Sequence, residues 1–238
     1  MSELQLVVEE SVSEIQSIRD LLELSKRTDQ DNEYILDPQT RIVAANAIHL
    51  YISAFFERAA RELAKAFLQA AIEKGIPEDR AKKIRAGAWD KVSEELRSKP
   101  FGSRDFDIGD AESGVSVLSA CLGPELSQAI GRKAVYNRRN LRPKELNVVF
   151  GRIGVVQVAD KIGRCREYKE FFGVAKVSEA QDEFIQYLEE FYIERNDVMH
   201  DLEAMRSRGA TDVDRYLSFF EAAVSRAAVV LQQELDSF

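Results

Sequence analysis

Three residues close together in the sequence, Arg195, Asn196 and His200, could act together on a phosphate group. An arginine guanidinium is always charged, and its planar fork matches two phosphate oxygens. An imidazole has an unperturbed pKa of about 6.5, so it can accept and donate protons near neutral pH. A structural role is the alternative, because a cationic arginine and a histidine near the carboxyl end of a helix also suit the helix dipole. The spacing alone leaves both interpretations open.

A strongly basic segment runs from Gly131 to Lys169. It contains eleven Lys and Arg residues against three acids, so it carries +8 of a total charge of −8, and the rest of the chain carries −16. Concentrated positive charge suits a polyphosphate backbone, and sequence-tolerant binding is mainly phosphate neutralisation. A solvated basic face that balances the negative charge of acidic helices elsewhere in the fold would give the same pattern. The candidates for contacting a nucleic-acid backbone are Arg138, Arg139, Arg142 and Lys144.

Other kinds of chemistry have little support in the sequence. The chain has two His and two Cys, none at metal-ligand spacing, so we expect no metal centre, no disulfide framework and no cofactor. Phosphate-binding glycine loops and the nucleophile elbow of α/β hydrolases are missing from the sequence as well. An acidic amino terminus and the lack of an apolar run of about 20 residues predict a cytoplasmic protein with no membrane partner.

Helical periodicity extends through the chain and predicts an all-α fold, with long antiparallel helices and short helices inserted between them. A first helix is expected over 3–24, with Val8, Val12, Ile15, Arg19 and Leu22 on one side. The second has the clearest limits, because Asp37 is a natural N-cap, Pro38 suits the first helical position and Gly75 suits the end. A third is expected over 77–98.

The remaining segments are expected to complete one domain over 1–238, with a core at about 37–98 and 124–236. Residues 99–114 hold three glycines and mixed charges, which predicts a flexible loop. Short helices are expected at about 124–134, 143–153 and 156–171. Ser178 with Gln181, and Thr211 with Asp214, have the spacing of capping boxes and predict the starts of the last two long helices.

The stretch Arg195-Asn-Asp-Val-Met-His200 and its helical context resemble the HEPN superfamily, whose motif is an Arg followed after four to six residues by His. The second helix, with LYISAFFERAARELAKAF, and the stretch from Asn140 through NLRPKELNVVFGRIG are similar to stand-alone bacterial HEPN-like nucleases of the RiboL-PSP type. The resemblance covers about 37–235. It implies an HEPN-like bundle and a metal-independent endoribonuclease that acts as a homodimer.

The resemblance also implies roles for individual residues. Arg195 would stabilise charge on the phosphate, His200 would do the acid–base work, and Asn196 would orient one of them. Glu57 lies where HEPN proteins often hold a polar residue near the site, although an exposed helix-surface glutamate is the alternative. The RNA 2′-OH would be the nucleophile, which leaves a 2′,3′-cyclic phosphate. The family context adds a toxin or phage-defence role, with an antitoxin or companion defence protein as partner.

The spacing of Arg195 and His200 sets a geometric condition on such a site. Five residues turn an α-helix by about 500°, so the two positions point about 140° apart. Either the helix unwinds before His200, or a two-fold axis pairs the arginine of one protomer with the histidine of the other. The rival interpretation is a non-catalytic helical module that dimerises and binds nucleic acid or a partner protein, because one fold can host both kinds of function.

Overall fold

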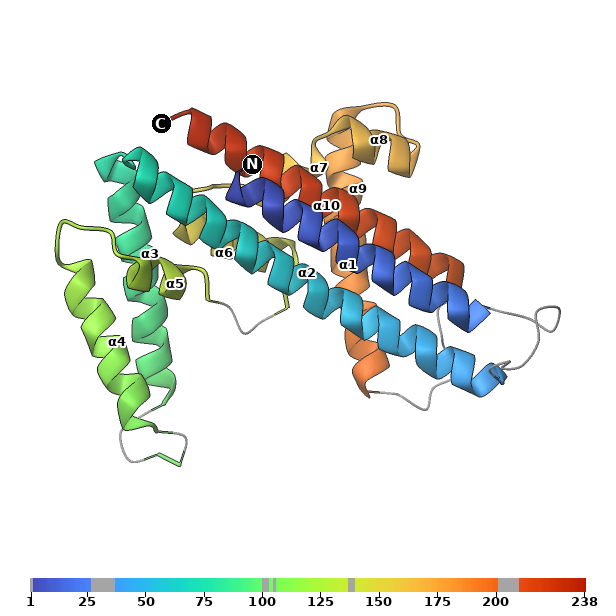
Figure 1. The fold of residues 1–238 in the computed structure, drawn as a ribbon, viewed down its shortest axis with the longest axis horizontal. Coiled ribbons are helices and arrows are strands. Elements are labelled where there is room, and N and C mark those ends of the chain that lie inside the picture. Colours follow the sequence, from blue (N-terminus) through green and yellow to red (C-terminus); the bar gives the residue numbers. More distant parts are fainter. Residues whose placement is uncertain (1, 27–36, 100–102, 105, 137–139, 201–209) are drawn as a thin grey trace. The chain divides into compact units, whose positions relative to one another are not determined.

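The computed structural model describes residues 2–26, 37–99, 103–104, 106–136, 140–200 and 210–238. Over these ranges the chain forms ten α-helices and no β-strand, which confirms the all-α prediction (Figure 1). The helices are α1 (Glu3–Lys26), α2 (Pro38–Lys74), α3 (Glu78–Ser98), α4 (Ile108–Cys121), α5 (Gln128–Ala134), α6 (Pro143–Arg152), α7 (Val158–Gly163), α8 (Arg166–Phe172), α9 (Val177–His200) and α10 (Ala210–Asp236).

The contacts divide the chain into two compact units. Unit 1 comprises Met1–Ala60 and Asp160–Val229, and unit 2 comprises Arg61–Ala159 and Val230–Phe238. Helices α2 and α10 each contribute residues to both units. The organisation as one domain stays a prediction, and the two units are described separately below.

Unit 1 is built from α1, α8, α9, the first parts of α2 and α10, and α7 from Asp160 onward. In this unit α1 lies alongside α2 and α10 and runs antiparallel to both (Figure 1). Helices α2 and α10 therefore run parallel to one another. The antiparallel arrangement predicted for the long helices does not extend to this pair. Arg19 of α1 forms an ion pair with Glu221 of α10 at 2.8 Å, and Glu14 forms one with Arg58 of α2. These partly exposed pairs align the three helices more than they stabilise them.

The buried side of α1 agrees with the predicted one only in part, at Ile15 and Leu22. Its buried residues are Leu4, Ser11, Ile15, Ile18 and Leu22, whereas Val12 is exposed. Both faces contain apolar residues at helical spacing, so the pattern of α1 alone does not decide between them. The neighbouring helices decide it, and they leave Val12 in solvent.

Aromatic rings fill the centre of unit 1. The ring of Phe219 contacts those of Tyr168, Phe184 and Tyr187, with centroids 4.8–5.3 Å apart. Tyr168 is fully buried, and its hydroxyl donates a hydrogen bond to the Phe219 carbonyl at 2.8 Å. Each ring removes a large apolar area from water, and tilted ring pairs add to this stabilisation. The cluster joins α8, α9 and α10 and fixes the position of α9.

Unit 2 has a more aliphatic core. Helix α3 packs against α4, α5 and α6 (Figure 1), and Ile84, Ala88 and Val92 on its inner face are fully buried. A Cβ on Gly87 would come within 2.8 Å of the Arg152 Cβ, so only glycine lets α6 approach α3 this closely. The missing side chain therefore sets the distance between these two helices.

The predicted limits of α2 and the predicted extent of α9 are confirmed, but the start of α9 is capped by a different residue than predicted. The Asp37 carboxylate accepts the backbone N–H groups of Gln39 and Thr40 at 3.0 and 3.1 Å, and Gly75 follows α2 with a φ of 84°. At the start of α9 the Glu179 carboxylate, rather than the Ser178 hydroxyl, accepts backbone N–H groups, those of Ala175 and Lys176. The Gln181 amide instead donates to Asp160. The capping box predicted at Ser178 is wrong, because an acid one residue later takes its place.

The loop predicted over 99–114 is wrong from Ile108 onward. Helix α4 begins there, and the Asp107 carboxylate caps it by accepting the Asp110 N–H at 2.8 Å. Residues 100–102 and 105 lie outside the described residues. Gly114 lies inside the helix, where a Cβ would come within 3.2 Å of Val92. This glycine therefore marks a close approach between helices and not a loop.

Candidate functional site

Arg195 is held by polar contacts to two helices of unit 1. The side chain is half-buried on α9, and its Nε donates to the Ser53 hydroxyl oxygen on α2 at 3.4 Å. A guanidinium nitrogen also donates to the Asn196 side-chain oxygen at 3.3 Å. Ser53 is buried and donates its own proton to the Leu50 carbonyl at 2.8 Å, so its lone pairs remain available to the arginine. The predicted pair Arg195 and Asn196 therefore comes together.

Ser53 belongs to a polar line on α2 that was not singled out in the sequence. Asn46, His49, Ser53 and Glu57 follow one another at spacings of three and four, so they share one face of the helix. The first three are buried and Glu57 is half-buried. A polar residue at each turn of a buried helix face is the signal that could have found Ser53. Glu57, predicted as an accessory residue, lies one turn beyond Ser53 on this face.

His49 belongs to the aromatic packing of unit 1. Its ring stacks on Phe191 of α9 with centroids 4.6 Å apart, and it meets Tyr216 of α10 edge-on at 5.2 Å. Because the side chain is only 2% exposed, an RNA substrate has no direct access to this histidine. His200 is therefore the histidine to consider for proton transfer.

His200 is the last residue of α9, and its side chain lies outside the described part of the structure. The backbone nevertheless excludes one of the two geometric alternatives, the unwinding of the helix before His200. The helix continues through position 200, so it does not unwind between Arg195 and His200. Within one protomer the two positions remain about 140° apart around the helix axis.

The other side of α9, next to Arg195, is acidic. Glu194 accepts a hydrogen bond from the Tyr216 hydroxyl at 2.6 Å. Both residues line a cavity of about 300 Å³ in unit 1 whose other walls include Glu183, Glu190 and Asp212. Arg215 also lines this cavity, so four carboxylates face one arginine and the wall keeps an excess of negative charge. This side of α9 does not suit an anionic ligand.

Of the four predicted RNA-binding residues, the structure describes Arg142 and Lys144. Arg138 and Arg139 lie outside the described residues. Arg142 is half-buried just before α6, and Lys144 is exposed in its first turn. Both belong to unit 2, whereas Arg195 belongs to unit 1.

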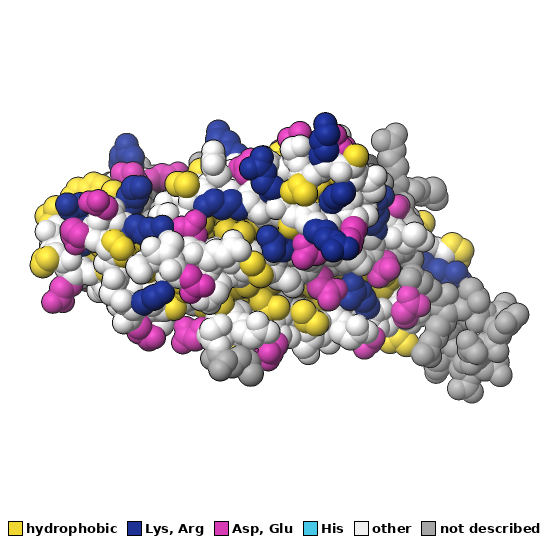
Figure 2. Space-filling view, turned by 90° about the horizontal axis from the view of Figure 1, so that it is seen from above, with side chains coloured by type: hydrophobic (Ala, Val, Ile, Leu, Met, Phe, Trp, Pro, Cys, Tyr) yellow, Lys and Arg dark blue, Asp and Glu magenta, His cyan; other side chains and the backbone are white. Residues whose placement is uncertain are grey.

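The basic segment over 131–169 is shared between the two units and is partly neutralised. Lys133 pairs with Glu95 at 3.1 Å, and Arg166 pairs with Glu170 at 2.7 Å. On the face drawn in Figure 2, Lys and Arg side chains lie next to Asp and Glu side chains. The concentration of charge in the sequence therefore overstates the concentration of charge on the surface.

Two further kinds of feature, metal-ligand clusters and membrane-spanning helices, concern the described parts of the chain. Nowhere in them do three or more His, Cys, Asp or Glu side chains gather as ligands for a metal ion. None of the described helices combines the length and the apolar composition that crossing a membrane requires.

Comparisons with known proteins identify no relative of this chain. The chain matches no family model, no curated protein and no solved structure. The HEPN resemblance therefore rests on the RNDVMH stretch and its helical context alone, and its functional content is a proposal.

Proposed function

We propose that this protein is a metal-independent endoribonuclease that cleaves RNA through its own 2′-OH. The observation that carries the proposal is the fixed guanidinium of Arg195, which Ser53 and Asn196 hold half-buried on α9, five residues before a histidine in the same helix. A fixed positive charge costs little reorganisation when charge develops on a phosphate. Arg195 would stabilise that charge, and Asn196 would orient it.

The reaction needs one proton acceptor and one proton donor. The 2′-oxygen attacks the adjacent phosphorus as its proton passes to His200, and the bond to the 5′-oxygen breaks. The leaving oxygen takes up a proton, so the products are a 2′,3′-cyclic phosphate and a 5′-hydroxyl. A general acid or base placed in this way contributes about 10²–10⁴-fold to the rate. DNA lacks the 2′-OH and is not a substrate.

A homodimer would bring the two groups to one phosphate. Because α9 continues through position 200, Arg195 and His200 of one protomer point in different directions. A two-fold axis can place the arginine of one protomer opposite the histidine of its partner. The proposed active site is therefore composite, and a monomer would be inactive.

The test is cleavage of a tRNA and mRNA mixture in EDTA by the wild type, His200→Ala and Arg195→Ala. We expect His200→Ala to lose about 10²–10⁴-fold in rate and Arg195→Ala about 10²–10³-fold. Arg19→Ala is the matched control, because this half-buried arginine of the same unit lies outside the basic segment and pairs with Glu221 of α10. Full activity of His200→Ala would remove the histidine from the mechanism.

Dimer complementation tests the composite site directly. A mixture of His200→Ala and Arg195→Ala protomers should regain activity, because one of the two sites in a mixed dimer then contains both wild-type residues. If the mixture stays as inactive as the single variants, although exchange of protomers is demonstrated, the site lies within one protomer.

A non-catalytic binding module is the second candidate function. The hydrogen bonds of Arg195 to Ser53 and Asn196 are internal, and such contacts also suit a residue that only holds α9 against α2. Expression in a bacterial host separates the two functions. The cellular role we propose is that of a toxin or phage-defence nuclease in the cytoplasm, with an antitoxin or companion protein as partner. Such a nuclease arrests growth when it is expressed alone, unless Arg195 is replaced. A binding module is tolerated in both forms.

A further inference from the structure

The single tryptophan of the chain, Trp89, lies on the outer side of α3 in unit 2. It is 38% exposed, whereas tryptophan is highly buried on average in folded proteins. The packed side of α3 contains Ile84, Ala88 and Val92, which are fully buried. Trp89 therefore presents part of a large apolar side chain to solvent, as aromatic residues at contact surfaces do.

Small side chains and cations accompany Trp89 along this side of α3. Residues at helical spacings of three and four share a face, and the row that contains Trp89, here called the Trp89 face, consists of Lys82, Ala86, Trp89, Ser93 and Arg97. All of them are exposed except Ser93, which is half-buried. Ala86 and Ser93, one turn before and after Trp89, are too short to cover the indole. Lys82 and Arg97 lie about 10 and 12 Å from it along the helix axis, on opposite sides.

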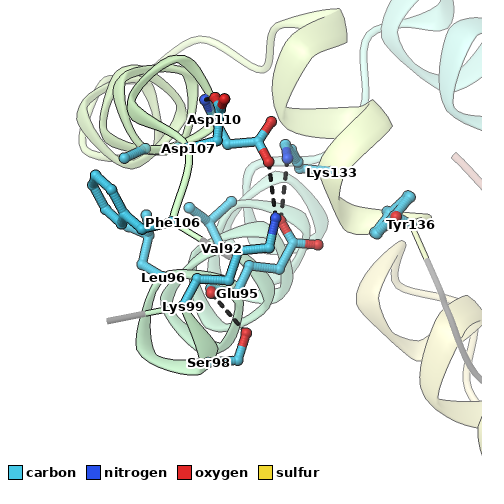
Figure 3. Close-up of a pocket in the computed structure, with 12 residues that line it drawn as sticks. Val92, Glu95, Leu96, Ser98, Lys99, Phe106, Asp107, Asp110, Lys133 and Tyr136 are labelled. Carbon is cyan, nitrogen blue, oxygen red and sulfur yellow. Dashed lines mark hydrogen bonds and ion pairs between the residues drawn. The ribbon is translucent and has the colours of Figure 1, made fainter. Parts of the chain in front are cut away.

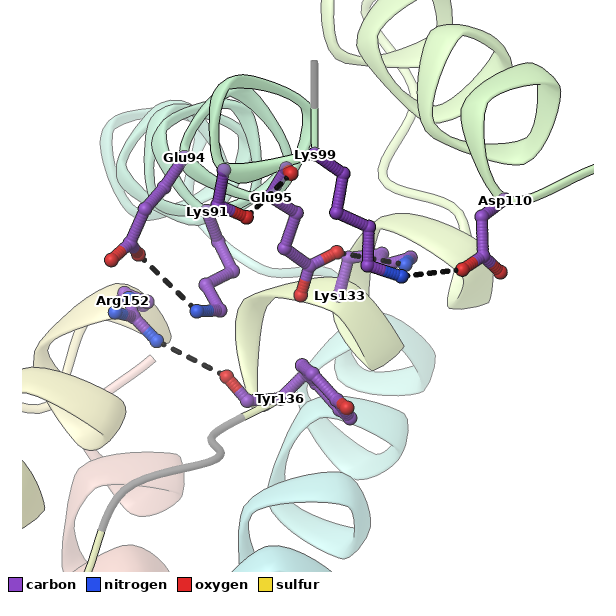
Figure 4. A network of polar contacts seen from close by, with 9 residues as sticks. Lys91, Glu94, Glu95, Lys99, Asp110, Lys133, Tyr136 and Arg152 are labelled. Atoms are coloured by element: carbon purple, nitrogen blue, oxygen red, sulfur yellow. Dashed lines mark hydrogen bonds and ion pairs between the residues drawn. The ribbon is translucent and has the colours of Figure 1, made fainter. Parts of the chain in front are cut away.

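Other charged residues at the carboxyl-terminal end of α3 are neutralised within the protein. A cavity of about 200 Å³ lies there among α3, α4 and α5 (Figure 3). The ion pairs in and near it join Lys133 to Glu95 at 3.1 Å, Lys99 to Asp110 at 2.9 Å and Lys91 to Glu94 at 3.2 Å (Figure 4). These pairs balance one another and leave little net charge for an ionic ligand.

The cations of the Trp89 face are not neutralised in this way. Within the described residues Lys82 forms no ion pair, and Arg97 forms one hydrogen bond, from its Nε to a carbonyl oxygen of its own helix at 3.2 Å. Lys83, next to Lys82, is exposed and has no ion pair in these residues either. Two acids, Asp79 and Asp90, border the face, so three cations stand against two acids and the charge stays positive. The lysine and the arginine can therefore bind phosphate groups.

We infer that the Trp89 face is a binding surface for single-stranded RNA, in which an unpaired base packs against Trp89 while phosphates on either side of it contact Lys82 and Arg97. The inference rests on the proposed function, which supplies RNA as the ligand, and it adds a binding surface in unit 2 to the site at Arg195 in unit 1. Proteins that bind single strands without strong sequence preference combine aromatic side chains for the bases with cations for the backbone. The bases of a duplex are stacked and paired, so the indole cannot reach them.

Intrinsic fluorescence tests this surface directly, because Trp89 is the only tryptophan of the chain. The probe is a short 2′-O-methyl oligouridine, which has no free 2′-OH and so cannot be cleaved by the proposed mechanism. Titration into the full chain should quench the tryptophan emission, and a 2′-O-methyl duplex of similar length should quench it much less. Unchanged emission, or equal quenching by the single strand and the duplex, overturns the inference.

Ring variants locate the effect. Trp89→Ala should weaken binding of a fluorescein-labelled oligouridine, measured by anisotropy, about 5- to 150-fold, the contribution of one stacked base. Trp89→Phe keeps a ring and should retain most of the affinity. Tyr51→Ala is the control, because this exposed ring of α2 lies beside an acid, to which its hydroxyl donates a hydrogen bond at 2.6 Å. Equal losses in Trp89→Ala and Tyr51→Ala overturn the assignment.

A lysine variant tests the phosphate contact without touching the packed side of α3. Lys82→Gln should reduce the slope of log affinity against log salt concentration by about 0.7, the value for one phosphate of a single strand. Lys65→Gln is the matched control in the same unit, because this exposed lysine pairs with Glu62 at 2.8 Å. An unchanged slope in Lys82→Gln, or an equal change in both variants, overturns the phosphate contact.

The outcome is separable from that of the ribonuclease test. Cleavage in EDTA that depends on His200, together with no quenching of Trp89, would overturn this surface and leave the nuclease. Quenching by the single strand that is weakened in Lys82→Gln, without cleavage by the wild type, would retain the surface and overturn the nuclease.

Discussion

Arg195 in unit 1 and Glu95 in unit 2 are both half-buried charged side chains on long helices, and their surroundings differ. Arg195 meets a buried serine and a neighbouring amide, on a helix that aromatic rings hold in place. Glu95 meets one lysine and lines a cavity, and its other carboxylate oxygen is buried with no hydrogen-bond donor in the described residues. The polar contacts of Arg195 are supplied by the protein, whereas those of Glu95 are only partly supplied.

The difference lies in packing and in how fully each charged group is satisfied. A group that stabilises developing charge benefits from being fixed before the substrate arrives. Aromatic rings fill the centre of unit 1, whereas α3, α4 and α5 of unit 2 border a cavity, so the comparison can be tested through packing.

The largest expected effect comes from removing the central ring of unit 1. Phe219→Ala deletes a fully buried ring that contacts Tyr168, Phe184 and Tyr187, and we expect the free energy of unfolding to fall by about 3–5 kcal/mol. Urea denaturation followed by circular dichroism measures the loss.

Phe150→Ala in unit 2 is the comparison for this variant. Phe150 is fully buried too, but within the described residues its ring has no aromatic neighbour. It should therefore cost less than Phe219→Ala by the ring-pair stabilisation, about 0.5–1.5 kcal/mol for each pair. A larger loss for Phe150→Ala would show that the aromatic cluster is not the tighter of the two cores.

The sequence predicts local features of both units better than their long-range contacts. Asp37 and Gly75 mark the ends of α2 because a cap and a left-handed residue act within one turn of chain. Gly114 suggested a loop, yet its reason is the approach of Val92 from another helix. The buried face of α1 was predicted only at Ile15 and Leu22 for the same kind of reason, since neighbouring helices select it.

The candidate sites show the same division. Arg195 and Asn196 were found because they are adjacent in sequence and belong to one motif. Ser53 lies 142 residues away from Arg195, and Lys133 lies 38 residues away from Glu95. Hydrogen bonds across such separations follow from the tertiary fold and leave no periodic pattern. The polar spacing on α2 was the one local sign of Ser53.

An intermediate effect is expected from adding one methyl group in each unit. A Cβ on Gly163 would lie 2.8 Å from the Phe184 Cβ and 3.1 Å from the Gln181 Cα, so backbone must move. We expect Gly163→Ala to lower the free energy of unfolding by about 1–3 kcal/mol. A Cβ on Gly114 would meet only the tips of Val92 and Leu96 at 3.2–3.3 Å, beside the cavity.

Gly114→Ala should therefore cost less than Gly163→Ala, because its neighbours can shift into the cavity. Thermal unfolding of the two variants beside Gly151→Ala compares them, since a Cβ on Gly151 meets nothing within 4 Å and that change should be neutral or stabilise by about 0.4–1 kcal/mol. A greater cost at Gly114 than at Gly163 would contradict the open packing assigned to unit 2.

The smallest effect concerns pH and the buried phenol of unit 1. Burial raises the pKa of Tyr168 well above its ordinary value of 10.0, and neighbouring Cys165 raises it further. The folded protein therefore keeps this proton while the unfolded chain releases it, so the contribution of the phenol to stability is complete below pH 10 and falls as the pH rises above it.

At pH 8, Tyr168→Phe should cost about 1 kcal/mol through the lost hydrogen bond to the Phe219 carbonyl. Urea midpoints at pH 8 and pH 10.5 should show the wild type losing its advantage over Tyr168→Phe at the higher pH. An advantage that stays constant or grows would mean that Tyr168 ionises inside the folded core, and the dense packing assigned to unit 1 would then be wrong at its centre.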